Sequence, residues 1–408
     1  MTRTSPIATR FRHVTGGLLS PVSKADVGET AGRLLEQGYD VLAWADPFFP
    51  DRSLPASVRA AMLAEIEAGL PEHYTMPIGD LGLRRTIAAR IAATTGLQVD
   101  PQRHVIVTPG SDSGLLLALM PLLEPGDEVL VPDPSYPSNV RDVEILGAVP
   151  VTVPLDAADG YRLDVAAFER ARTERTRVVL LSHPNNPTGT VFRREWLEEL
   201  AAWIVANDLV LVSDQAFEDH VYDDLEMVTP ATLPGMWERT ISVYSISKGL
   251  GLSGLRVGYV VADTPFMDVY YGAAVNVVGA TSTVSQAGAV AALQDPTILP
   301  ANRAELLEHR EVAWRLLHDV PGVRATWPES GILLWLDVSA LGSGAEVADH
   351  LVRNARVLVN DGAAYGPSGA DHVRLVFGCY RSAAQLETVL TRVRAALLEL
   401  AAERGLVE

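Results

Sequence analysis

The middle of the chain alternates short apolar runs with longer stretches in which apolar residues recur at helical spacing. Runs rich in Val, Ile and Leu predict strands at residues 105–108, 128–131, 151–154, 177–182, 209–213 and 240–245. Helices are predicted at residues 113–123 and 195–207. Continuous apolar strands between amphipathic helices are typical of a parallel sheet that helices cover on both faces. We therefore predict an α/β fold whose large domain is built on a mostly parallel sheet.

The C-terminal part of the chain follows a different pattern. Long helical patterns cover residues 301–318 and 382–404, and strands are predicted between them at residues 331–336 and 372–377. Strands and helices in this order predict a smaller α+β domain. The chain before about residue 50 is too short to fold alone, so we expect it to pack on this domain. The predicted units are an N-terminal segment, a large domain and a small domain, at residues 1–54, 55–296 and 297–408.

Residues 269–294 carry no charged side chain, and a stretch of this length could cross a membrane. Its amide, hydroxyl and glycine residues make it too polar for that, so we interpret it as a buried loop and helix at a subunit contact. The N-terminus lacks an apolar core of signal-peptide length. We therefore expect a soluble protein without a membrane span.

The composition narrows the class of partners. The chain has 408 residues, 48% of them apolar and 21% charged, which predicts an ordered globular protein with a formal net charge of −18. This charge argues against nucleic acids and anionic membranes, because both are bound through basic patches. The single cysteine, Cys379, excludes an intrachain disulfide and fits a reducing cytoplasm. No Cys/His cluster offers a metal site.

Lys248 lies among small and hydroxyl residues in Ser-Ile-Ser-Lys-Gly-Leu-Gly-Leu-Ser-Gly-Leu-Arg, with Arg256 eight positions later. A lysine in a partly dry pocket that holds other cations loses its proton more readily and can attack an aldehyde. Ser245, Ser247 and Arg256 are the groups that a phosphate dianion needs. An aldehyde and a phosphate together indicate pyridoxal 5′-phosphate (PLP). The alternative is a surface lysine in a glycine-rich loop.

The segment Thr-Pro-Gly-Ser-Asp-Ser-Gly joins a predicted strand to a predicted helix at residues 108–114. Backbone N–H groups at the start of a helix form a cradle for phosphate, so Gly110, Ser111 and Asp112 are candidates. The Asp112 side chain would repel a phosphate, so we assign this residue mainly through its backbone N–H. In isolation, such a loop is more often a plain helix cap.

Three polar side chains follow the ends of other predicted strands, where ligands gather in open α/β sheets. Tyr136 can stack on a flat pyridine ring, or it can stiffen a proline-rich turn. Asn186, in His-Pro-Asn-Asn-Pro-Thr-Gly, can donate to the phenolic oxygen of PLP, although this motif is also a common turn. Asp214 can keep the pyridine nitrogen protonated, which makes the ring an electron sink; the other reading is a helix cap.

These segments, in this order, resemble aminotransferase classes I and II of the fold-type I PLP enzymes, the aspartate aminotransferase superfamily, from about residue 40 to the end. The resemblance implies that Lys248 forms the internal aldimine and moves the Cα proton of the substrate. It also implies that Asp214 pairs with the pyridine nitrogen, Asn186 with the phenolic oxygen and Tyr136 with the ring face. The phosphate would be bound by Ser245, Ser247, Arg256 and the loop at residues 110–112.

Two further segments resemble the same family. Tyr74, in His-Tyr-Thr-Met-Pro-Ile-Gly-Asp-Leu-Gly-Leu-Arg, matches a tyrosine that reaches the phosphate of the neighbouring subunit, which implies a homodimer with shared active sites. The other reading of Tyr74 is a turn residue that packs on its own helix. Arg374 matches the arginine that binds the substrate α-carboxylate, since a guanidinium fork suits a carboxylate. An edge-strand surface arginine is the alternative.

The chain departs from the family pattern at two positions. Phe217 replaces a tyrosine that commonly donates to the phenolic oxygen, so we expect the ionised phenol to be less stable. Ala45 replaces a glycine whose backbone approaches the substrate, and its methyl group could narrow the site or have no effect. Residues 257–302 contain no lysine or arginine, which weakens an aspartate-specific reading and favours a neutral or cationic side chain.

The resemblance implies a PLP-dependent aminotransferase that acts on an L-amino acid and a 2-oxo acid. Other reactions of the same carbanion remain open, because a fold does not fix a function. They are β- or γ-elimination or replacement, cyclisation, decarboxylation and oxidation. Some transcription regulators carry a similar domain behind a DNA-binding one, but the acidic charge and the short stretch before the resemblance argue against this class.

Overall fold

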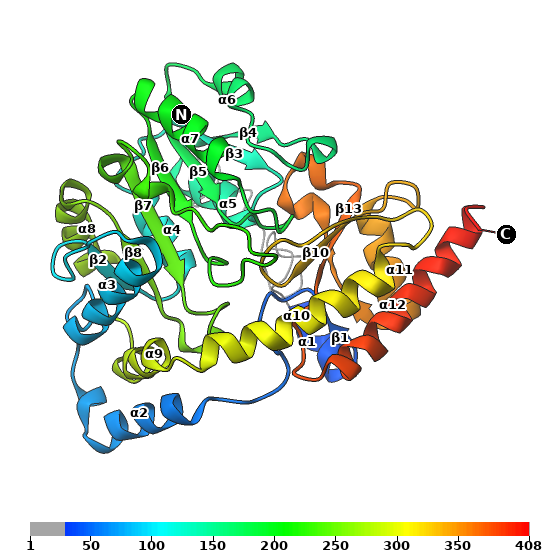
Figure 1. Ribbon diagram of the computed structural model, residues 1–408, viewed down its shortest axis with the longest axis horizontal. Helices are drawn as coiled ribbons and strands as arrows, with labels where there is room; N and C mark the ends of the chain where they lie inside the picture. The colour runs from blue at the N-terminus through cyan, green and yellow to red at the C-terminus, as the bar shows by residue number, and fades with distance from the viewer. Residues whose placement is uncertain (1–28, 408) are drawn as a thin grey trace, which may run out of the picture.

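The computed structural model describes residues 29–407, and its centre is a seven-stranded sheet (Figure 1). The first 28 residues of the predicted N-terminal segment lie outside the described residues. The strands are β2 Val105–Thr108, β3 Glu128–Asp133, β4 Val149–Pro154, β5 Thr176–Ser182, β6 Val210–Asp214, β7 Thr240–Ser245 and β8 Gly258–Val261. Their order in the sheet is β2-β8-β7-β6-β5-β3-β4.

All neighbouring strands from β4 to β7 pair in parallel, and only β8 runs antiparallel, between β7 and β2. The prediction of a mostly parallel sheet is therefore confirmed. The strand β8 was not predicted, because its four residues follow the lysine segment without a preceding helical pattern. Since β8 lies between two strands of the opposite direction, the carboxyl ends of β2, β3, β5, β6 and β7 meet at one edge of the sheet.

Alternate side chains of the parallel strands face two separate apolar clusters. Val178 and Leu180 of β5 join the cluster under α4 Ser111–Leu119, α5 Pro137–Leu146 and α8 Thr264–Val277. Val179 and Leu181 join the cluster under α6 Val165–Ala171 and α7 Arg194–Ala206. This period of two is what an extended strand imposes, and it explains why a strand buried on both faces reads as a continuous apolar run.

The remaining helices of the large part lie beside the β2–β8 edge. They are α2 Ala56–Glu67, α3 Leu81–Thr95 and α9 Thr283–Gln294. Figure 1 shows α2 beside α9 at the lower margin of the molecule. Their apolar side chains pack on Val105, Val107, Tyr244 and Tyr259 of the sheet.

A four-stranded antiparallel sheet forms the second part of the molecule, in the order β12-β13-β10-β9. Its elements are β9 Arg324–Thr326, β10 Leu333–Asp337, β12 Asn360–Asp361 and β13 His372–Val376, with α10 Ile298–Leu317, α11 Gly344–Ala355 and α12 Ala383–Glu403. Figure 1 shows α10 running from the large sheet to this smaller one. The α+β prediction for the C-terminal part is confirmed, and the predicted boundaries at residues 54/55 and 296/297 stay a prediction.

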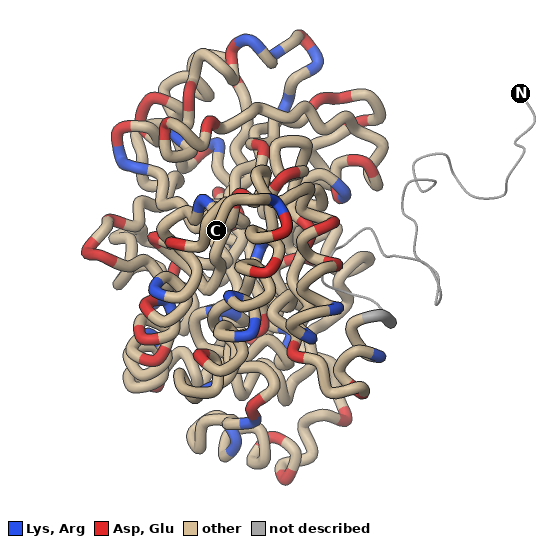
Figure 2. The backbone as a smooth tube through the Cα atoms, turned by 90° about the vertical axis from the view of Figure 1, so that its right-hand side faces the viewer, with Lys and Arg blue, Asp and Glu red and all other residues tan. Residues whose placement is uncertain are grey.

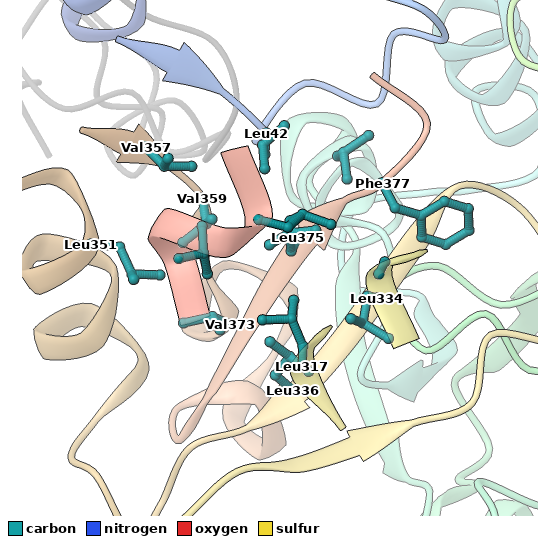
Figure 3. Packing of buried hydrophobic residues seen from close by; sticks show 14 of the residues in the cluster. Leu42, Leu317, Leu334, Leu336, Leu351, Val357, Val359, Val373, Leu375 and Phe377 are labelled. Carbon is teal, nitrogen blue, oxygen red and sulfur yellow. The ribbon is translucent and has the colours of Figure 1, made fainter. Parts of the chain in front are cut away.

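The described part of the N-terminal segment packs on the small sheet, as expected. It contains α1 Glu29–Glu36 and β1 Asp40–Val41, and β1 pairs in parallel with β11 Val357–Leu358. Leu42 continues this contact, because its N–H donates to Leu358 O at 2.8 Å and its carbonyl accepts from Val376 N at 2.8 Å. Figure 3 shows the Leu42 side chain within the same apolar cluster as Val359 and Leu375.

Two sequence predictions need correction. Helix α4 begins at Ser111 and ends at Leu119, whereas residues 113–123 were predicted, because Gly110 adopts a positive φ of 84° and turns the chain directly into the helix. The uncharged stretch at residues 269–294 forms most of α8 and all of α9 rather than a buried loop and one helix. Val269, Val275 and Val277 of α8 are half or more exposed, so this stretch is not fully buried.

The distribution of charged residues and the character of the helices bear on the surroundings of the described chain. Figure 2 shows basic and acidic residues interspersed along the backbone. Among the helices of residues 29–407, none combines the length and the apolar character that crossing a membrane requires.

Candidate active site

A pocket lies at the carboxyl edge of the large sheet, where the segments after five strands meet the small sheet. Most of the predicted site residues line it, together with one that was not predicted, Ala216. The lining residues are Ala45, Ser111, Asp112, Tyr136, Asn186, Asp214, Ala216, Phe217, Ser245, Ser247, Lys248, Arg256 and Arg374. Parallel strands explain this convergence, since residues far apart in the sequence follow strand ends at the same edge.

One end of the pocket is formed by the start of α4 and the Arg256 side chain. A Cβ atom on Gly110 would lie 2.3 Å from Nη2 of Arg256, so only glycine permits this approach. A Cβ on Gly258 would lie 2.6 Å from the backbone nitrogen of Ser111, so β8 also packs closely against this turn. The positive end of a helix, a guanidinium and the hydroxyls of Ser245 and Ser247 together have the chemistry that binding of a phosphate dianion requires.

Asp214 ends β6 and lies at the bottom of the pocket, 6% exposed. Its Oδ1 accepts from the backbone nitrogen of Ala216 at 3.1 Å, and its Oδ2 accepts from the Ser182 hydroxyl at 3.2 Å. The amide Nδ2 of Asn139 donates to the same Ser182 oxygen at 2.9 Å, which fixes the orientation of that hydroxyl. Burial raises the pKa of the Asp214 carboxyl to about 6, although its hydrogen bonds and the charge of Lys248 act in the opposite direction.

Lys248 follows β7, and its Nζ donates to the carbonyl oxygen of Ala45 across the pocket. The backbone of the lysine loop is held from outside the pocket. Nε2 of His220 lies 3.3 Å from the Lys248 carbonyl oxygen, and Nδ2 of Asn302 donates to the Gly249 carbonyl at 3.1 Å. The amine is therefore presented by a fixed loop, and it points towards the carbonyl oxygen of Ala45.

Arg374, in the middle of β13, is completely buried and points into the pocket from the small sheet. Its guanidinium donates to Oδ1 of Asn360, to the carbonyl oxygen of Ala43 at 2.8 Å and to Oδ1 of Asn186 at 3.2 Å. The ring of Tyr365 lies under it, with the guanidinium carbon 4.8 Å from the ring centroid. Within residues 29–407, the hydrogen-bond acceptors of Arg374 are amide and backbone oxygens, and no carboxylate is among them.

The other two predicted pocket side chains have defined neighbours. The Tyr136 hydroxyl donates to Oδ1 of Asp112 at 2.9 Å, so the side chain of Asp112, in the first turn of α4, helps to fix the Tyr136 ring. Phe217 is 5% exposed, and its ring packs so closely on the backbone that a Cβ on Gly331 would lie 3.0 Å from it.

The structure does not bring Tyr74 into this pocket. Its side chain is 97% exposed, so the alternative in which it packs on its own helix is wrong for the described chain. Besides Ala216, three residues around the pocket were not predicted: Ser182, Asn360 and Tyr365. Ser182 had a detectable signal, since it is a polar residue at a strand end beside Asp214, whereas Asn360 and Tyr365 belong to no motif. Residues 29–407 contain no group of three or more His, Cys, Asp or Glu side chains placed to hold a metal ion.

The pocket fits PLP by three features of its own geometry. The close approach of Gly110 to Arg256 forms a phosphate cradle that a larger residue would fill. Burial raises the pKa of the Asp214 carboxyl more than the charge of Lys248 lowers it. A pyridinium next to Asp214 would stabilise the ionised carboxylate. The Lys248 amine lies in the same pocket and supplies the nucleophile for an aldehyde.

Comparison with known proteins agrees with this geometry. Residues 41–393 match the family described as aminotransferase class I and II. The chain is 33% identical over 377 residues to the arginine–pyruvate transaminase of Pseudomonas aeruginosa, covering 92% of this chain and 94% of that protein. It is 31% identical over 356 residues to the aromatic-amino-acid aminotransferase 2 of Thermococcus litoralis, covering 86% and 90%.

The solved structure of the aromatic aminotransferase from Pyrococcus horikoshii superposes with a TM-score of 0.84 at 29% identity. This superposition covers 92% of the present chain and all of the other. Fold, pocket and sequence thus agree, and the chain belongs to the aminotransferase class I and II family, the PLP-dependent transaminases of fold type I.

Proposed function

We propose that Arg374 binds the α-carboxylate of an L-amino acid and that Lys248 moves its Cα proton during transamination to a 2-oxo acid. The observation that carries this assignment is the complete burial of Arg374 among neutral partners of the described chain. A buried guanidinium without a counter-ion is costly, and a carboxylate ligand would offset the cost through charge-assisted hydrogen bonds.

PLP, when bound, supplies an aldehyde that condenses with amines and a ring that withdraws electrons from Cα. Asp214 keeps a proton on the ring nitrogen, since a buried carboxylate is stabilised by a cation beside it. Asn186 donates from Nδ2 to the phenolic oxygen, because its Oδ1 already accepts from Arg374. Ser245, Ser247 and Arg256 bind the phosphate with the start of α4.

Lys248 acts as the acid and base between Cα and the cofactor. Its Nζ has an acceptor in the Ala45 carbonyl oxygen on the opposite wall of the pocket. Ala45 therefore contributes through its backbone, and its methyl group borders the space for the substrate.

We propose a neutral or cationic side chain for the amino donor. The described part of the pocket holds three cations, and each has a role: Lys248 for the aldehyde, Arg256 for the phosphate and Arg374 for the α-carboxylate. None of the described basic lining residues is left to pair with a distal carboxylate. The two relatives reported above are named for arginine and for aromatic amino acids, which are donors of this kind.

We further propose a homodimer in which Tyr74 enters the pocket of the partner. Tyr74 lies in a stretch of exposed apolar residues with Leu70 and Met76, which are 50% and 63% exposed, and Leu63 and Ile66 on α2 continue this surface. An exposed apolar surface of several adjacent residues is typical of a subunit contact. The single cysteine suits the cytoplasm as the compartment.

The test of this function is a half-reaction screen. Purified holoenzyme is mixed with single amino acids, and the visible absorbance of the cofactor is followed together with the released 2-oxo acid. Transamination predicts loss of that absorbance and one 2-oxo acid per site, with basic or aromatic donors faster than aspartate. Ammonia, peroxide or a cyclised product without loss of absorbance would contradict it. The variant Arg374→Lys should raise KM for every amino acid.

A further inference from the structure

Asn360 lies directly opposite Arg374 in the register between β12 and β13. We propose that Asn360 is a positioning residue for the substrate clamp: it fixes the guanidinium within its own plane and leaves its charge uncompensated for the substrate carboxylate. This inference rests on the proposed role of Arg374. Asn360 does not line the pocket, so it acts through the arginine and not on the substrate.

The hydrogen bonds of the guanidinium define its free edge. Nε donates to Oδ1 of Asn360 at 3.0 Å, and Nη2 donates to the same oxygen at 2.7 Å. The second hydrogen of Nη2 is taken by the Ala43 carbonyl oxygen. Within residues 29–407, Nη1 donates only to Asn186, so one of its hydrogens has no acceptor among these residues. The carboxylate is thus taken at the Nη1 end, beside Asn186, and not at the Nε side.

Tyr365 and Asn360 each fix a different aspect of the orientation of the Arg374 guanidinium. The ring of Tyr365 lies under the guanidinium and sets the tilt of its plane. A cation–π contact is tolerant of rotation within that plane, because it depends on the ring face and not on the direction of the N–H groups. Asn360 Oδ1 removes this remaining freedom, since it accepts from two adjacent nitrogens of the rigid fork.

Because the Asn360 side chain is uncharged, it leaves the positive charge of Arg374 unpaired. An aspartate at this position would offer the same acceptor oxygen, but it would pair its charge with Arg374 in a buried setting where screening is weak. Asn360 is 1% exposed, and its Nδ2 has no hydrogen-bond partner in the part of the chain that the structure describes. A buried amide donor without a partner weakens the folded state, so the contribution of this side chain comes from its oxygen.

The experiment compares Asn360→Asp with Asn354→Asp in the holoenzyme. Asn354 is exposed on α11 of the same part of the molecule, so its replacement adds the same charge away from the clamp. KM and kcat are measured for the amino acid that the half-reaction screen selects and for its decarboxylated amine. For Asn360→Asp we expect KM of the amino acid to rise by about tenfold or more, with a smaller change in kcat. The preference for the amino acid over the amine should fall by a similar factor, and Asn354→Asp should match the wild type.

A second variant, Asn360→Leu, removes the acceptor without adding a charge. We expect a rise in KM of about three- to tenfold, because the guanidinium stays charged but turns more freely. If both Asn360 variants keep the wild-type KM and preference, or if neither folds, the inference is overturned. Arg374→Lys distinguishes failure of the proposed role of Arg374 from failure of the role of Asn360. If Arg374→Lys leaves the preference for the amino acid over the amine unchanged, the proposed function is wrong. If Arg374→Lys abolishes this preference and the Asn360 variants do not change it, only the role of Asn360 is wrong.

Discussion

Nη1 of Arg374 donates to Oδ1 of Asn186 at 3.2 Å, and this contact joins the small sheet to the loop after β5 of the large sheet. A guanidinium can only donate, so the bond fixes the amide of Asn186 with its oxygen towards Arg374. The Nδ2 group is then available on the other side of the amide. One asparagine therefore links the proposed carboxylate site to the proposed phenolic-oxygen site.

Replacing Asn186 by aspartate should affect both sites. The new carboxylate would pair with Arg374 and would remove the donor to the phenolic oxygen, so we expect KM for amino acids to rise about tenfold or more. The pH titration of the cofactor absorbance should shift to a higher pKa, because the ionised phenol loses a donor and gains a negative neighbour. Asn360→Asp is the matched comparison, since it should raise KM without this shift. An unchanged titration in Asn186→Asp would exclude the proposed donor role.

Asn186 and Arg374 show which features of the site can be predicted from the sequence and which cannot. Each was predicted from a motif or a resemblance, but their contact was not, because they are 188 positions apart and belong to separate sheets. Strands that are buried on both faces give strong local signals, so β5, β6 and β7 were predicted within one or two residues. The short strand β8 and the orienting residue Asn360 gave none, since their positions depend on pairing with distant strands.

Asp214→Asn should change how the stability of the cofactor-free protein depends on pH. Because burial raises the pKa of Asp214 from 3.8 to about 6, the folded protein holds a proton that the unfolded chain releases between these values. The wild type should therefore lose stability as the pH rises through this window, by on the order of 3 kcal/mol. The asparagine variant lacks this loss and should be the more stable protein at pH 8.

The measurement is urea unfolding of both cofactor-free proteins at several pH values between 4 and 8. A difference between them that stays constant across this range would contradict the raised pKa. Bound PLP should favour the wild type over Asp214→Asn, because a pyridinium beside Asp214 stabilises the charged carboxylate. Asp214→Asn should therefore bind PLP more weakly than the wild type although its cofactor-free form is more stable.

Phe217→Tyr should lower the pKa at which the cofactor absorbance titrates. A phenol at this position would donate to the ionised oxygen of PLP and favour the ionised form, by about one unit. Phe217 lines the pocket and packs on Gly331, so the ring already has its position. The check is a pair of pH titrations on the two holoenzymes, and superimposable curves would remove the proposed effect of this departure from the family pattern.

Tyr74→Ala should weaken PLP binding without weakening the fold, because the side chain is 97% exposed in the single chain. The shared site can be tested by mixing this variant with Lys248→Ala after subunit exchange. In the mixed dimer one pocket combines the intact Lys248 of one subunit with the intact Tyr74 of the other. Random pairing then gives wild-type PLP affinity in about a quarter of all sites. If every active site in the mixture binds PLP as weakly as Tyr74→Ala alone, the tyrosine acts within its own subunit or not at all.

Gly110→Ala should abolish tight PLP binding, and Gly126→Ala is its matched control. Both glycines have a positive φ, 84° and 95°, so alanine strains the backbone at each by about 1–3 kcal/mol. Only at Gly110 does the added Cβ meet a neighbour, Nη2 of Arg256 at 2.3 Å, whereas nothing lies within 4 Å of a Cβ on Gly126. Gly126→Ala should therefore lose stability and keep its PLP dissociation constant. Gly110→Ala must displace Arg256 from the start of α4, and its dissociation constant should rise about tenfold or more, since the phosphate loses a charge-assisted contact. Equal PLP affinity in the two variants would show that the strain alone, and not the position of Arg256, governs the phosphate site.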